Sequence, residues 1–118
     1  MYKELDEFGK ILINDVRDRT IRNIDSIISG KMKDSESQVI YKKISNFGED
    51  EKLLINILIP KIIDFSIHNM LEMFEENEKI ELIINGKNLA EISDGLAGEL
   101  YTEDGWIQKF SEQRYEDI

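Results

Sequence analysis

Residues 53–74 are apolar on nearly every side of a helical projection, and this stretch restricts the fold more than any other part of the chain. A helix on the surface of a globular protein keeps a polar face, so a helix that is apolar all round is expected inside a core. Three acidic residues at 49–51 precede the stretch and suit the positive end of a helix dipole. Pro60 removes a backbone N–H and clashes with the preceding turn. The pattern predicts a central helix over residues 50–76, kinked or broken near Pro60.

The first 28 residues have the apolar spacing of an amphipathic helix. Between Val16 and Ile21 the stripe takes a step of five residues in place of three or four. The two halves of this helix should therefore face different neighbours or be separated by a local irregularity. Gly30 supplies the stop, since glycine accepts the left-handed cap conformation. The stripe consists of Leu5, Phe8, Leu12, Val16, Ile21, Ile24 and Ile28.

A second, shorter helix is expected before the central one. Ser35 and Gln38 have the spacing of a capping box, in which each side chain satisfies a free backbone N–H of the other residue. Gly48 ends the helix. Its predicted buried stripe consists of Ile40, Ile44 and Phe47.

After the central helix the apolar residues become β-branched and the runs become short. Asn85 and Gly86 separate two such runs, and this dipeptide is typical of a tight hairpin turn because both residues accept positive φ. We predict one β-hairpin over residues 79–93, packed against the helices because a lone hairpin is marginal in water. Two short helical turns should follow it.

These elements predict an α+β fold that is mainly α, with four to five helices around the central helix and one hairpin. The length of 118 residues fits a single domain over residues 1–118. Residues 112–118 are mostly polar and are expected to fray.

The composition excludes several classes of protein. Without cysteine, disulfide frameworks, thiolate metal sites and cysteine nucleophiles are absent. The longest uncharged apolar run, residues 53–60, is shorter than the ~20 residues of a membrane span, and no secretory signal opens the sequence. The sequence also lacks phosphate-binding loops and nucleophile elbows. We expect a cytoplasmic protein without a cofactor, and an enzyme is not the favoured interpretation.

The net charge of −10 is unevenly distributed. Residues 1–60 carry 10 basic and 11 acidic side chains, whereas residues 61–118 carry 5 and 14. An acidic surface repels phosphate groups, so nucleic acid and anionic membranes are not expected partners, and a basic protein is. The simpler alternative is that the acids only keep the chain soluble.

The stretch at 93–106 combines acidic residues, glycines and the single tryptophan. Tyrosine and tryptophan are common in the energetic centres of protein interfaces. The alternative is that they cover one end of the core. The candidate partner-binding residues are Glu99, Tyr101, Glu103, Asp104 and Trp106.

A small, acidic, cysteine-free domain resembles in general character the bacterial immunity proteins, which neutralise basic toxins. The resemblance implies a non-catalytic inhibitor or binding module for a basic partner. A generic regulatory or assembly subunit is the broader form of the same interpretation.

Two pairs of carboxylates support an enzyme as the alternative. Glu72 and Glu75 resemble in spacing the Glu-x-x-Glu helices of all-helical nucleotide pyrophosphohydrolases, and Asp15 and Asp18 are the matching pair on the first helix. The resemblance implies a magnesium-dependent phosphohydrolase. It requires all four carboxylates to converge on one metal ion.

The single histidine, His68, has Asp64 four residues before it and Glu72 four residues after it. On a helix these three side chains form one row. A solvated structural role, an ion pair and metal ligation are the three interpretations that the row allows.

Self-association is the third functional class. The remaining elements are too few to cover the central helix, and leftover apolar surface usually marks an interface. We expect a homodimer that packs through the first helix or through residues 53–59, because residues 1–60 are nearly neutral.

Overall fold

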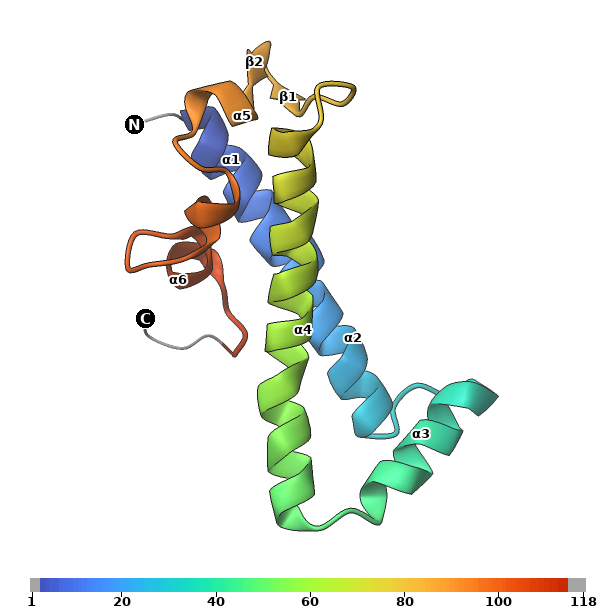
Figure 1. The fold of residues 1–118 in the computed structure, drawn as a ribbon. Coiled ribbons are helices and arrows are strands. Elements are labelled where there is room, and N and C mark those ends of the chain that lie inside the picture. The colour runs from blue at the N-terminus through green and yellow to red at the C-terminus, as the bar shows by residue number, and fades with distance from the viewer. Residues whose placement is uncertain (1–2, 115–118) are drawn as a thin grey trace.

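The frame of the molecule is a pair of helical segments that cross each other (Figure 1). The computed structural model describes residues 3–114. The first segment consists of α1 (Lys3–Leu12), the π-helical turn η1 (Ile13–Asp18) and α2 (Arg19–Ile28). It is joined through α3 (Ser35–Ser45) to the second segment, α4 (Glu49–Glu76).

The C-terminal part of the chain folds back over one end of this frame (Figure 1). The structure confirms an α+β fold that is mainly α, with one two-stranded antiparallel hairpin. The elements after α4 are β1 (Ile83–Ile84), β2 (Lys87–Asn88), α5 (Leu89–Ile92), the 3-10 turn η2 (Ala97–Leu100) and α6 (Trp106–Phe110).

Helix α4 is continuous through Pro60, so of the two predicted alternatives, a kink or a break, the break does not occur. Proline removes one helical hydrogen bond and leaves the carbonyl four residues earlier without its partner. That carbonyl belongs to Asn56, an exposed residue, so water can satisfy it. The loss of one bond at an exposed turn is therefore compatible with a continuous helix.

Only one stripe of α4 is buried, whereas the sequence predicts a helix in the core on all sides. The buried residues contact the core at spacings of four: Ile59, Ile63, Ile67 and Leu71. The start of α4 extends together with α3 beyond the core (Figure 1). The molecule is therefore elongated and measures 49 × 30 × 21 Å. A chain of this size has too few helices to cover α4 on every side.

By length and composition alone, α4 could also cross a membrane, and it is the one such helix among residues 3–114. Of its most apolar 18-residue window, 17% is buried.

The five-residue step in the first helix is accommodated by the π-helical turn η1, which is the predicted irregularity. A π turn is wider than an α turn and changes which residues face inward. Ile13 is fully buried, whereas Val16 is 45% exposed, so the assignment of Val16 to the apolar stripe is wrong. The same turn directs two consecutive charged residues, Arg17 and Asp18, into the interior.

Helix α3 is capped by Asp34, not by the predicted Ser35. The Asp34 carboxylate accepts the backbone N–H of Ser37 at 3.1 Å, and hydrogen bonds from Ser37 hold the pKa of Asp34 below its ordinary value. Ile40 and Phe47 are exposed, so the predicted buried stripe of this helix is wrong at these two positions. Helix α3 protrudes from the frame, where no further element is available to cover them (Figure 1).

The hairpin is shorter than predicted. Asn85 and Gly86 form the turn with φ of 51° and 78°, as a tight hairpin requires. Each strand has two residues, and residues 89–92 form helix α5 in place of a second long strand. The cause is local, because the Asn88 side chain accepts the backbone N–H of Ala90 at 3.1 Å and thereby starts a helix.

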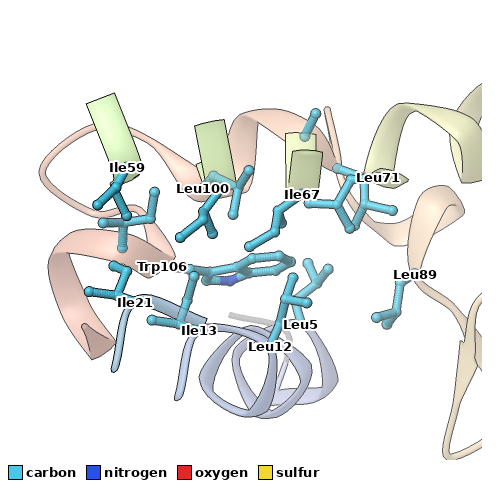
Figure 2. Close-up of a cluster of buried hydrophobic side chains, with 14 residues drawn as sticks. Leu5, Leu12, Ile13, Ile21, Ile59, Ile67, Leu71, Leu89, Leu100 and Trp106 are labelled. Carbon is cyan, nitrogen blue, oxygen red and sulfur yellow. The ribbon is translucent and has the colours of Figure 1, made fainter. Parts of the chain in front are cut away.

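The core lies where α1, α4 and the C-terminal elements meet, with Trp106 in its middle (Figure 2). Phe8 meets the indole edge to face, with ring centroids 5.9 Å apart. A Cβ at Gly9 would lie 2.5 Å from atoms of the indole. Glycine at this position therefore allows α1 to approach Trp106 closely.

Candidate functional site

The loop between α5 and α6 encloses a hollow of about 350 Å³, which we call the acidic hollow. Three of its lining residues carry carboxylates, and among residues 3–114 no lysine or arginine lines it. The lining residues are Asp94, Gly95, Gly98, Glu99, Tyr101, Thr102, Asp104 and Gly105.

Local hydrogen bonds fix the Glu99 carboxylate at the hollow. The Ser93 hydroxyl donates to Glu99 Oε2 at 2.7 Å, and it accepts the backbone N–H of Gly95 at 3.1 Å. One serine therefore connects the start of the loop to η2.

Tyr101 is attached to α4 through the histidine. Its hydroxyl lies 3.1 Å from His68 Nδ1, and His68 Nε2 lies 2.7 Å from Glu72 Oε1. A carboxylate only accepts, so Nε2 carries the proton toward Glu72, and in the neutral ring Nδ1 accepts from the Tyr101 hydroxyl. Burial raises the pKa of Tyr101, and the nearby carboxylates of Asp64 and Glu72 raise it further. The phenol is therefore neutral at pH 7 and remains a hydrogen-bond donor.

The backbone of the hollow needs residues in unusual conformations. Thr102 has φ of 74°, a left-handed conformation that is rare for a β-branched residue. At Gly105 a Cβ would lie 1.9 Å from the carbonyl oxygen of Tyr101, so only glycine fits there. The backbone N–H of Gly105 donates to the carbonyl of Thr102 at 3.1 Å and closes the turn.

The structure places four of the five predicted partner-binding residues on this loop surface. Glu99, Tyr101 and Asp104 line the hollow, and Glu103 is exposed beside it. Trp106 is 1% exposed, so its assignment to a partner-binding surface is wrong. Trp106 instead occupies the core, where its large apolar ring is removed from water.

The first carboxylate pair of the predicted magnesium site does not form one ligand group. Asp15 is exposed, 3.9 Å from Arg19 in an ion pair. Asp18 is buried, and its two oxygens accept the Ser111 hydroxyl and the Glu112 backbone N–H, each at 2.8 Å. The two carboxylates therefore have separate structural roles.

The second pair is also divided. Glu72 bonds to His68, whereas Glu75 accepts the backbone N–H of Ala97 at 3.2 Å. Within residues 3–114 no group of three or more histidine, aspartate or glutamate side chains could hold a metal ion. The convergence that a magnesium-dependent phosphohydrolase requires is absent from the described residues. For His68, the structure shows the predicted contact with Glu72.

A buried polar cluster surrounds Arg17, and no pattern in the sequence predicts it. This side chain is 1% exposed and bonds to both oxygens of Asp64, at 2.6 and 3.3 Å. It also donates to the Ser111 hydroxyl and to the carbonyls of Gln113 and Arg114. The π turn directs the Arg17 side chain inward, and the five-residue step between Val16 and Ile21 is the sequence feature that predicts an irregularity here.

Residues 112–114 are held by this cluster, so the predicted fraying is wrong for these three residues. Arg114 forms a further ion pair with Asp25 of α2. The rest of the predicted tail, residues 115–118, lies outside the described residues.

No protein-family model, curated protein or solved structure matches the chain. What the chain does must therefore be inferred from its own surfaces.

Proposed function

We propose that the chain is a non-catalytic protein-binding module whose acidic hollow receives a lysine or arginine side chain of a basic protein partner. The observation that supports this function best is the lining of the hollow, to which the described part of the chain contributes the carboxylates of Asp94, Glu99 and Asp104 and no basic side chain. A concave surface of one charge concentrates ligands of the opposite charge.

The surrounding charge suits the same partner. Residues 61–118 carry 14 acidic and 5 basic side chains, so the half of the chain that contains the hollow attracts a basic protein over a distance. Once docked, each hydrogen bond to a charged group contributes about 1.5–3 kcal/mol. Anionic partners, including nucleic acid and acidic membranes, are repelled by the same charge.

The hollow is built to keep its shape before a ligand arrives. Tyr101 is tied to α4 by His68, and Glu99 is tied to Ser93. Preorganised groups lose little entropy on binding, so more of the contact energy contributes to affinity. The most concrete form of this function is inhibition of a cationic protein in the cytoplasm, as in immunity proteins, and a regulatory or assembly subunit is the broader form.

A capture experiment with matched variants tests the proposal. The wild-type chain is immobilised and exposed to an extract of its own cells at ~0.05 and ~0.5 M salt, since screening at the higher salt acts within a few ångströms. The hollow variant carries Asp94→Asn, Glu99→Gln and Asp104→Asn. The control variant loses the same charge at exposed positions elsewhere, through Glu36→Gln, Glu78→Gln and Glu81→Gln.

We expect the wild type and the control variant to retain the same protein of high isoelectric point at low salt, and the hollow variant to lose it. Retention that is equal for all three chains, or that is unchanged at ~0.5 M salt, contradicts a charge-selective hollow.

A further inference from the structure

A second apolar stripe runs along α4 on the side away from the core. Its members follow each other in steps of four, four and three residues, which places them on one face of a helix. That face lies roughly opposite the stripe that begins at Ile59 and packs into the core. The side chains expose between 48% and 65% of their surface: Leu54, Leu58, Ile62 and Phe65.

The exposed stripe borders an apolar groove of about 360 Å³ between α2 and α4. Ile62 belongs to both, and Val16 and Ile24 contribute from the first helical segment. A ridge of apolar side chains beside a groove is the surface with which helices pack against each other. Contiguous apolar patches larger than a few hundred Å² usually mark an interface on a soluble protein.

We propose that a second copy of this chain covers the stripe, in a two-fold dimer whose α4 helices lie antiparallel. The distribution of charge selects this occupant and this direction. Residues 54–65, which span the stripe, carry one basic and one acidic side chain, Lys61 and Asp64, so the stripe lies in a neutral part of a chain whose acidic excess is in residues 61–118. Antiparallel helices place the two acidic C-terminal halves at opposite ends of the dimer, whereas parallel helices would bring them together.

In this arrangement Leu54 of one copy lies near Phe65 of the other, and Leu58 lies near Ile62. A two-fold interface is self-complementary, so one stripe suffices for both subunits. The loop of the hollow contacts α4 at His68 and Glu75, beyond the end of the stripe at Phe65, so the dimer leaves both hollows open to partners.

Two contacts of α4 distinguish a second copy from membrane lipid as the occupant. Asp64 of α4 bonds to Arg17 at 2.6 Å, and Leu71 of α4 is fully buried in the core. Insertion of α4 into a bilayer would break both contacts and would expose the buried Arg17. A second copy covers the exposed stripe and leaves the core intact.

Sedimentation velocity of the full chain over about 1–100 µM tests the dimer. We expect a particle of twice the 13.8 kDa chain mass at the higher concentrations. Leu58→Glu places a charge in the seam and should raise the dissociation constant about 100-fold or more. The matched control is Ile83→Glu on the hairpin, which changes an equally exposed apolar residue and should leave the dimer unchanged.

Circular dichroism verifies that each variant is folded, and Phe65→Ser provides a second seam variant should Leu58→Glu be unfolded. A 13.8 kDa particle at ~100 µM overturns the proposal, as does a dimer that neither seam variant weakens. Association of the wild type with phosphatidylcholine vesicles in place of dimerisation also overturns it and assigns the stripe to lipid.

The direction of the helices can be measured because the chain has no cysteine. Chains with Leu54→Cys and chains with Phe65→Cys are mixed and oxidised. Antiparallel packing predicts disulfides between the two kinds of chain, and disulfides mainly between identical chains contradict it. None of these outcomes depends on whether the acidic hollow binds a basic partner.

Discussion

Replacing Arg17 with alanine should destabilise the fold more than any other loss of a single charge. The guanidinium is 1% exposed and donates to Asp64, Asp18 and Ser111 and to two backbone carbonyls of residues 113 and 114. It therefore joins the first helical segment to α4 and to the C-terminal residues.

The magnitude follows from what Arg17→Ala leaves behind. Asp18 is also 1% exposed, so it becomes a buried charge without a counter-ion. Removal of one partner of a buried ion pair costs about 3–5 kcal/mol. Asp64 lies nearer the surface and can be rehydrated, which keeps the expected loss within that range. Because domains of this size are stable by about 5–15 kcal/mol, the loss is a large share of the total.

Urea denaturation followed by circular dichroism measures the loss, with Arg19→Ala as the matched control. Arg19 is largely exposed and pairs with an exposed carboxylate, so its removal should change the free energy of unfolding by less than about 0.5 kcal/mol. Adding Asp18→Asn to Arg17→Ala should recover part of the loss, because the unpaired charge is then removed. A loss below about 1 kcal/mol for Arg17→Ala would refute the reasoning.

Three further changes test other parts of the structure. Gly9→Ala should destabilise the fold by about 1–3 kcal/mol, because the new Cβ meets the Trp106 indole. The control is Gly98→Ala, whose Cβ meets no atom within 4 Å and which should be tolerated. Thermal unfolding compares the two variants. Because the pKa of Tyr101 is raised in the folded state, the folded chain loses the phenol proton at a higher pH than the unfolded chain. Stability from this residue is therefore complete below pH 10 and is lost as the pH rises through the folded-state pKa, and Tyr101→Phe should remove that part of the alkaline decline in urea titrations. Pro60→Ala should stabilise α4 by up to about 3 kcal/mol, since it restores a helical hydrogen bond, and an unchanged or lower urea midpoint would contradict this.

The parts of the fold that the sequence predicts correctly depend on local rules. The long helix follows from the apolar run and its acidic start, and α4 begins at Glu49 as this signal indicates. Gly30 has φ of 81°, the left-handed conformation expected at the end of the first helical segment. The turn at Asn85 and Gly86 follows from the conformations that these two residues accept.

The error at Trp106 occurs because a distant part of the chain decides the outcome, whereas the error in the length of the hairpin has a local cause at Asn88. Trp106 and Tyr101 lie in the same glycine-rich stretch, and local pattern cannot tell which one faces inward. Trp106 is buried because Gly9, near the other end of the chain, provides room for the indole. Tyr101 remains at the surface because its hydroxyl bonds to His68, 33 residues away.

The candidate site shows the same limit. The acidic character of the stretch at 93–106 is visible in the sequence, and Glu99 and Asp104 do line the hollow. Spacing alone also suggests that Asp15 and Asp18 act as a pair. The π turn instead leaves Asp15 exposed to solvent and buries Asp18. Carboxylates at i and i+3 share a face only in a regular α-helix.

The most direct test of the proposed function is to locate a bound cation on the molecule. The ¹⁵N-labelled chain is titrated with a tetra-arginine peptide at ~0.05 M salt, and the backbone amide shifts are followed by NMR. We predict saturable shifts centred on residues 93–105, with a dissociation constant at least tenfold weaker for the variant that carries Asp94→Asn, Glu99→Gln and Asp104→Asn, and unchanged for the control variant of equal charge. Shifts spread over the whole acidic surface, weakened equally by both variants, would contradict the account.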